Sequence, residues 1–152
     1  MDAEANEPSH EEAISILYTH NTFSFQTLSS ILDLNTILPS AYFHSIRSVL
    51  LNLFLKPEIF VDEACTQESE AWRRVWAVIA SMQRLTDIRL TLSMVCTKIS
   101  EVQEARILGP LCKVEHLRTF HVDVPWDVSD KARNQGPYWI LKNGRLLKAS
   151  VS

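Results

Sequence analysis

The chain has 152 residues, of which 46% are hydrophobic and 22% are charged, and its formal net charge is −3. This composition is typical of one soluble globular domain, and it excludes a disordered or collagen-like chain. No apolar stretch of the sequence approaches the ~20 residues that a membrane helix needs. The negative charge argues against nucleic acid as a partner, because nucleic-acid-binding domains neutralise phosphates with excess lysine and arginine. We therefore expect a soluble domain that binds neither nucleic acid nor membrane.

The cysteines indicate a reducing environment. Cys65, Cys96 and Cys112 are odd in number, widely separated and without a C-x-x-C pair. Such spacing encodes neither a disulfide framework nor a zinc ribbon. The acidic residues at the start of the chain also lack the basic and apolar regions of a secretory signal. We expect a cytoplasmic or nuclear protein.

Helix and strand signals alternate along the chain. Two capping-box patterns, Ser9 with Glu12 and Ser100 with Gln103, mark the starts of two helices. Runs of continuous or alternating apolar positions between the helical stretches indicate strands. The expected elements are a disordered acidic tail over 1–8, helices over 9–21, 27–38, 68–84 and 100–112, and strands over 22–26, 46–55, 86–94 and 117–124.

A helix lies in every gap between successive expected strands, and parallel neighbours in a sheet need crossovers of this kind. The sequence therefore predicts one α/β domain with a mainly parallel sheet of about four strands. In the third helix, Trp72 and Trp76 lie one turn apart. This spacing favours packing against the core over an aromatic platform for nucleic acid.

A short phrase, apolar-x-x-[IL]-R, occurs three times, and each copy is followed by an expected strand. The copies are Phe43-His44-Ser45-Ile46-Arg47, Leu85-Thr86-Asp87-Ile88-Arg89 and Val114-Glu115-His116-Leu117-Arg118. A repeated helix–turn–strand unit resembles an irregular leucine-rich array, whose strands line one parallel sheet. The alternative is chance, because the pattern is degenerate. We expect a leucine-rich-like domain over residues 9–128.

The C-terminal part of the chain differs in charge and pattern. Residues 131–152 contain five lysines and arginines and no acidic residue, which suggests a basic extension over 129–152. Within it, Asn143-Gly144 separates two apolar runs, the strongest short signal for a β-hairpin. The sequence therefore predicts a hairpin over residues 138–147.

Residues 12–25, E-A-I-S-I-L-Y-T-H-N-T-F-S-F, resemble a phrase of a large family of uncharacterised fungal proteins, E-A-x-x-x-L-Y-x-x-N-x-F-x-F. The resemblance implies strands separated by helices through about Trp126, and it implies no reaction. An F-box-like helix often precedes the phrase in that family. Here Pro8-Ser9-His10-Glu11 stand where the family has a C-R element. The resemblance therefore leaves, as one alternative, an F-box-type substrate-recognition fragment without its adaptor-binding part.

Residues that could carry chemistry are few. Cys112, His116, His121 and Asp123 have metal-ligand side chains, but their spacing does not bring four ligands together, so we expect no metal and no cofactor. The sequence has no G-x-S-x-G turn and no glycine-rich phosphate loop. We expect a non-enzymatic protein. The alternative is an orphan enzyme with an unrecognised Cys or His site, since any of the cysteines could meet a histidine in space.

The sheet face that the helices leave free is the candidate binding surface. Strand alternation predicts that its residues include Asn52, Phe54, Arg89, Thr91, Thr119, His121 and Asp123. A mixed apolar, hydroxyl and charged surface is typical of a solenoid-like sheet that binds a protein partner. Alternatively, the hairpin with Tyr138, Trp139 and Ile140 folds over this face and shields Leu50 and Phe54. The function that we expect is a protein-interaction module.

Overall fold

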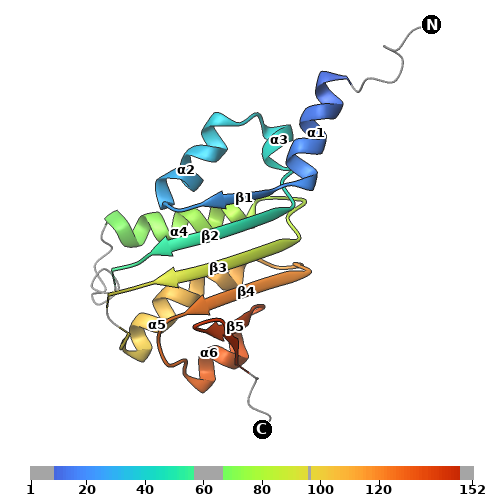
Figure 1. The fold of residues 1–152 in the computed structure, drawn as a ribbon. Coiled ribbons are helices and arrows are strands. Elements are labelled where there is room, and N and C mark those ends of the chain that lie inside the picture. Colours follow the sequence, from blue (N-terminus) through green and yellow to red (C-terminus); the bar gives the residue numbers. More distant parts are fainter. Residues whose placement is uncertain (1–8, 57–66, 96, 148–152) are drawn as a thin grey trace, which may run out of the picture.

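The computed structural model describes residues 9–56, 67–95 and 97–147. The expected tail over 1–8, Cys65 and Cys96 lie outside these residues. One sheet holds all the described strands, in the order β1-β2-β3-β4-β5-β6 (Figure 1). The strands are β1 (Thr22–Phe25), β2 (Ser48–Phe54), β3 (Asp87–Ser93), β4 (Thr119–Val124), β5 (Trp139–Lys142) and β6 (Arg145–Leu146). Neighbours from β1 to β5 are parallel, and β6 is antiparallel to β5.

The predicted α/β class with a mainly parallel sheet and a C-terminal hairpin is confirmed. The described helices are α1 (His10–His20), α2 (Leu28–Ile37), α3 (Ser40–Phe43), α4 (Gln67–Ala80), α5 (Glu101–Leu108), the 3₁₀ helix η3 (Gly109–Lys113) and α6 (Asp130–Gln135). Both capping boxes form, at Ser9 and at Ser100. The helices α3 and α6 were not predicted from the sequence, because each spans only one to two turns, too few for an apolar helical period to be visible.

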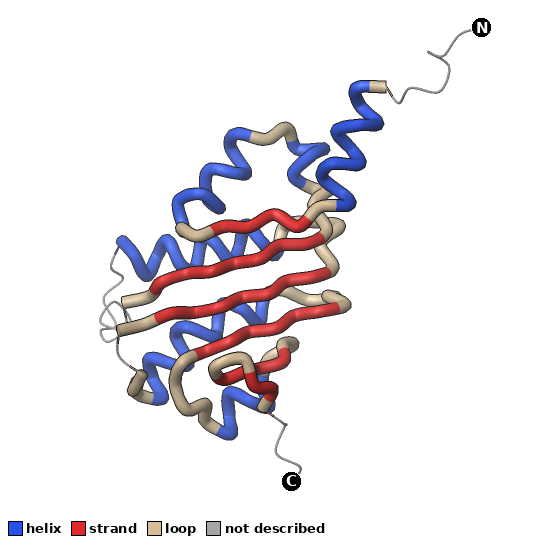
Figure 2. The backbone as a smooth tube through the Cα atoms, in the orientation of Figure 1, coloured by secondary structure: helices blue, strands red, loops and turns tan. Residues whose placement is uncertain are grey.

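The described helices cover one face of the sheet. Figures 1 and 2 show α4 and α5 behind the strands, and no described helix crosses the opposite face. The covered face supplies the core, because alternate strand residues are buried there against Trp72 and Trp76. The buried strand residues are Val49, Leu51, Leu53, Ile88, Leu90, Leu92, Phe120, Val122, Val124 and Ile140.

The C-terminal hairpin extends the sheet. Trp139 is aligned with His121 of β4, so β5 lies beside β4 in the plane of the strands. Leu50 lies in the same row but three strands from Trp139, a separation of roughly 14 Å at the usual strand spacing. Trp139 therefore does not shield Leu50, and the alternative in which the hairpin folds over the face is wrong. Two more strands join the sheet than the four expected from periodicity.

The hairpin turn has the geometry that the sequence predicts. Asn143 and Gly144 have φ angles of 49° and 80°, as the two central residues of a type I′ turn require. Replacing Gly144 with valine is therefore expected to loosen the hairpin by about 1–2 kcal/mol, the scale of a strained backbone position. Steric crowding is not the cause, because a Cβ at Gly144 would have no neighbour within 4 Å.

Limited proteolysis checks this prediction. Cleavage near Gly136 should be faster in Gly144→Val than in the parent chain, and the control Asn143→Gly should be cut at the parent rate. The sedimentation coefficient should not change. The hairpin lies beside β4 and covers no apolar patch on the other strands, so loosening it exposes no surface for self-association. Self-association of Gly144→Val would contradict this arrangement.

Strand register corrects the repeated phrase. Ser48, Asp87 and Thr119 are aligned across β2, β3 and β4. Arg47 and Arg118 therefore occupy equivalent positions, immediately before their strands, and Thr86 is the equivalent residue in the middle copy. Arg89 lies three residues further on, inside β3. The middle copy of the phrase is thus three residues out of register, and the buried pair of that unit is Met82 and Leu85.

Candidate functional site

The surface of the sheet that faces away from α4 and α5 is called the open face. Parallel pairing arranges its outward side chains in rows across the strands. One row contains Leu50, Arg89, His121 and Trp139, the next contains Asn52, Thr91 and Asp123, and Phe54 lies beside Ser93. All seven residues predicted for a binding surface lie on the open face, because their neighbours in each strand are buried on the other side.

The open face mixes aromatic and polar groups. Phe54 and Trp139 are each 57% exposed, far more than most large apolar side chains of a folded domain. Asn52 and Arg89 are exposed, and His121 is half-buried between strands. Each apolar group therefore stands among hydrogen-bonding groups, and the face is suited to contact with another molecule.

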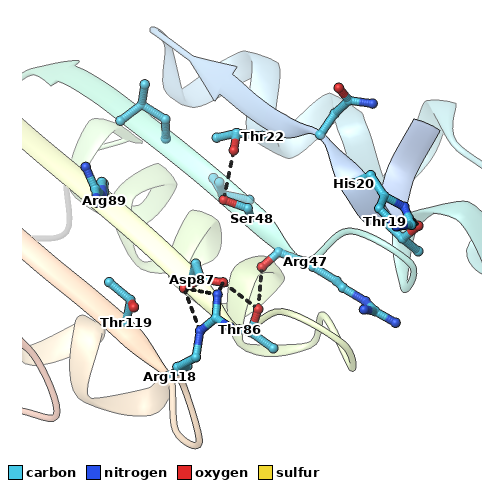
Figure 3. Close-up of a pocket in the computed structure, with 13 residues that line it drawn as sticks. Thr19, His20, Thr22, Arg47, Ser48, Thr86, Asp87, Arg89, Arg118 and Thr119 are labelled. Carbon is cyan, nitrogen blue, oxygen red and sulfur yellow. Dashed lines mark hydrogen bonds and ion pairs between the residues drawn. The ribbon is translucent and has the colours of Figure 1, made fainter. Parts of the chain in front are cut away.

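A cavity of about 750 Å³ lies where the strands of the open face begin (Figure 3). Its lining comes from the end of α1 and from the first residues of β1 to β4. The lining residues are Thr19, His20, Asn21, Thr22, Arg47, Ser48, Val49, Leu50, Thr86, Asp87, Arg89, Arg118 and Thr119. Of the seven predicted residues, only Arg89 and Thr119 belong to this cavity.

An ion pair organises the cavity. The Arg118 guanidinium lies against the Asp87 carboxylate, with Nη2 at 3.2 Å from Oδ1 and 3.0 Å from Oδ2. The Thr86 hydroxyl lies 2.7 Å from Asp87 Oδ2 and 3.1 Å from the carbonyl oxygen of Arg47, so its one proton can serve either acceptor. The Thr22 and Ser48 hydroxyls lie 3.1 Å apart across β1 and β2. The ion pair and the hydroxyls thus join the starts of neighbouring strands.

The Asp87 carboxyl is held in its ionised form. Burial by itself would raise its pKa, but hydrogen bonds from Thr86, Thr119 and Arg118, together with the charge of Arg118, lower it below the ordinary value. A carboxylate with a lowered pKa adds stability that is fully present above pH 3.8, the ordinary value, and is lost as the pH falls through the lowered pKa.

Replacing Asp87 with asparagine is expected to reduce the free energy of unfolding at neutral pH by about 1–2 kcal/mol, the scale of losing a charged acceptor at a partly exposed site. The variant should also lose less stability in acid than the parent chain. Urea unfolding over a series of acidic pH values measures both effects. The control is Asp33→Asn on α2, where the side chain is exposed. Parallel acid profiles for the parent and Asp87→Asn would contradict the prediction.

Two further guanidiniums lie at the cavity, and no described residue pairs with them. Arg89 stands on the open face and Arg47 extends outward from the rim, away from Asp87 and Arg118 (Figure 3). Within the part of the chain that the structure describes, neither Arg47 nor Arg89 has a side-chain hydrogen bond or ion pair. Among the described lining residues, Asp87 is the single acid, against three arginines. The cavity is thus locally cationic in a chain whose formal net charge is −3.

The residues considered for metal binding and catalysis are dispersed. His116 is in the connection before β4 with its side chain 93% exposed, whereas His121 and Asp123 are on the open face. Among the described residues, no three His, Cys, Asp or Glu side chains could share a metal ion. Partial burial raises the pKa of the Cys112 thiol, although a hydrogen bond with Tyr138 acts in the opposite direction. A nucleophilic cysteine needs a lowered pKa.

A second cavity, of about 440 Å³, lies on the helical side between α5, η3 and α6. Its polar anchor is Glu104, which is 5% exposed and accepts hydrogen bonds from Trp126 Nε1 at 2.8 Å and from the Ser129 backbone at 3.2 Å. Burial, with the nearby charges of Cys112 and Glu104, raises the pKa of Tyr138 above its ordinary value. These contacts connect the helices to β4 and β5, so we assign this cluster a structural role.

Comparison with known proteins supplies a family. The family described as Domain of unknown function (DUF7730) matches residues 9–140. The chain belongs to this family. The match includes every residue of the cavity and all seven predicted residues of the open face, and it ends within β5 of the DUF7730 chain. No curated protein and no solved structure matches the sequence. In the described part of the chain, no helix is long and apolar enough to cross a membrane.

The charged end of the DUF7730 sheet was not predicted from the sequence. Arg47 and Arg118 end two copies of the repeated phrase, but the phrase by itself indicates no role for them. Asp87 falls in the interior of the middle copy. The repeated phrase could have indicated that these residues lie together, because equivalent residues of successive parallel strands meet at the same edge of a sheet. To place Asp87 beside them, the register of the middle copy also has to be known.

Proposed function

We propose that the DUF7730 chain is a protein-interaction module that binds its partner on the open face. One observation carries the proposal. The described helices leave one face of a five-stranded parallel array uncovered, and outward side chains lie there in register from β2 to β5. Repeat proteins bind partners on extended surfaces that are built in the same way.

The chemistry of the open face supports this role. Protein interfaces are enriched in aromatic residues and arginine, and their strongest contacts often come from these side chains. Phe54, Trp139 and Arg89 provide such groups within a field of threonine, asparagine and histidine. A surface of this kind gives a partner both apolar contact and hydrogen bonds.

Binding is favoured over catalysis by the ionisation of three groups in the two cavities, Asp87, Cys112 and Tyr138. General acids and bases work best with a pKa near the operating pH. The pKa of Asp87 is lowered, and the pKa values of Cys112 and Tyr138 are raised. Each shift moves the group further from neutrality, which suits binding and packing better than proton transfer.

The test is a triple variant in which Asn52, Arg89 and His121 are all replaced by alanine. These side chains come from three neighbouring strands, and none is part of the buried core. The variant should therefore keep the circular dichroism spectrum and urea midpoint of the parent, within about 1 kcal/mol in the free energy of unfolding. We expect it to recover at least tenfold less of the protein partners that the parent chain recovers from its own cells, equivalent to ~1.4 kcal/mol.

In a matched control, alanine replaces Glu70, Arg74 and Glu101, which are exposed residues of the helical layer. The control should recover the same partners in the same amounts as the parent. Equal recovery by the triple variant and the parent would show that the open face is not the binding surface.

A further inference from the structure

We propose that the cavity at the strand starts receives an anionic side chain of the protein partner, so that the partner presents an acidic segment to this end of the open face. The inference rests on the proposed function and adds the charge of the partner and the place where that charge binds. An anionic side chain here means a carboxylate or a phosphate ester, because both are recognised by guanidinium groups in the same way.

The described lining of the cavity carries more positive than negative charge. Arg47, Arg89 and Arg118 line it, and Asp87 neutralises only Arg118. The described residues leave the guanidiniums of Arg47 and Arg89 without a partner. Isolated surface arginines are common, but these two border one hollow from adjacent strands, in a chain with more acidic than basic residues. An anion in the hollow would accept hydrogen bonds from Arg89, and a flanking acidic residue of the same segment would meet Arg47, which extends outward from the rim.

Asp87 holds the Arg118 guanidinium in place at the cavity. Asp87 engages its Nε at 3.4 Å and its Nη2 at 3.0 and 3.2 Å, while the side chain is still 79% exposed. A guanidinium has five N–H donors, so the remaining Nη1 protons are available to a second anion. Because Asp87 already fixes this side chain, binding costs less side-chain entropy than it would with a free arginine.

The cavity also has neutral hydrogen-bonding groups in its lining. The hydroxyls of Thr22 and Ser48 line the same hollow. One proton serves the hydrogen bond between them, so the other can be donated to an anion without adding charge. The volume of about 750 Å³ is larger than one carboxylate or phosphate requires, and it admits a side chain together with its flanking backbone. Arg89 belongs both to the cavity and to the open face, so a segment bound in the cavity continues directly onto the open face.

The probe is a fluorescein-labelled oligo-glutamate peptide, with a phosphoserine peptide of the same length and an oligo-lysine peptide beside it. Fluorescence anisotropy of the parent chain should rise with both acidic peptides and not with oligo-lysine. The double variant Arg47→Ser/Arg89→Ser should bind the acidic peptides at least tenfold more weakly, since it removes the guanidiniums of both Arg47 and Arg89. The tighter of the two acidic peptides identifies the anion as a carboxylate or a phosphate.

The control is Arg74→Ser, which removes an exposed arginine of α4 on the other side of the sheet. It should bind the acidic peptides as the parent does. Equal weakening by Arg74→Ser and by the double variant would show non-specific attraction and would overturn the inference. The inference also fails if the parent chain binds neither acidic peptide.

A second pair of variants separates this inference from the proposed function. Phe54→Ser alters the open face outside the cavity, and Arg47→Ser alters the cavity rim outside the strands. Partner recovery that falls with Phe54→Ser and not with Arg47→Ser would refute the anion site and leave the interaction module in place. Acidic-peptide binding that depends on Arg47, without any effect of Phe54→Ser on partner recovery, would support the anion site and count against the wider face.

Discussion

Replacing Trp72 with alanine is expected to lower the free energy of unfolding by about 3–5 kcal/mol, the range for truncating a buried tryptophan. Trp72 is 0% exposed, and its ring packs edge-on against Trp76 with centroids 5.6 Å apart. Its Nε1 donates a hydrogen bond to the carbonyl oxygen of Ile107 at 2.9 Å. The substitution therefore leaves a void between α4 and the sheet and a buried carbonyl without this donor.

Urea unfolding of Trp72→Ala and of the control Arg73→Ala measures this loss. Arg73 is the next residue of the helix, but its side chain is 52% exposed and its ion pair with Glu70 is 3.9 Å long. The control should change the free energy of unfolding by no more than about 0.5 kcal/mol, as expected for an exposed site. Similar losses in the two variants would mean that Trp72 is not the anchor of the core.

The second large effect is expected at Glu104, the buried carboxylate of α5. Replacing Glu104 with alanine should lower the free energy of unfolding by about 2–4 kcal/mol, because buried donors lose a charged acceptor. These donors are Trp126 Nε1 and the backbone and hydroxyl of Ser129, which caps α6. The loss should be largest in the region from β4 to α6, which depends on these bonds.

Hydrogen exchange and urea unfolding of Glu104→Ala check this prediction, with Glu101→Ala as the control. Glu101 is an exposed acid in the first turn of the same helix. Its replacement should cost no more than about 1 kcal/mol, mostly from its interaction with the helix dipole. A Glu104→Ala chain as stable as Glu101→Ala would show that the buried contacts of the carboxylate contribute nothing net.

Local signals were sufficient to predict most of the fold. Clean alternation predicted β3, because one face of this strand is buried and the period of two survives in the sequence. A nearly continuous apolar run predicted β2, but such a run is typical of a strand covered on both faces, whereas Asn52 and Phe54 are exposed. The capping boxes at Ser9 and Ser100 fixed two helix starts through contacts only three residues apart. Asn143-Gly144 specified its turn, since few other dipeptides accept two positive φ angles.

The functional site could be predicted only in part, since it depends on pairing between distant segments. The alternation that buries Ile88 and Leu90 also predicts that Arg89 and Thr91 face outward. Which residues of β2 and β4 lie beside them depends on register, and the middle copy of the repeated phrase lies three residues away from the true alignment. The cavity combines Arg47, Asp87 and Arg118 from three successive units, so no single stretch of sequence indicates it. The position of the hairpin likewise depends on pairing between segments, because β5 pairs with the edge of β4.

The most direct test of the interaction module is site-specific photo-crosslinking. A photoreactive side chain replaces either Asn52, on the open face, or Ala77, an exposed residue of α4 on the helical side. Both chains are irradiated in their own cells, and covalent adducts are identified by mass. We expect the Asn52 position to yield a defined adduct with a partner protein and the Ala77 position to yield none. Adducts from Ala77 with none from Asn52 would contradict the assignment of the open face as the binding surface.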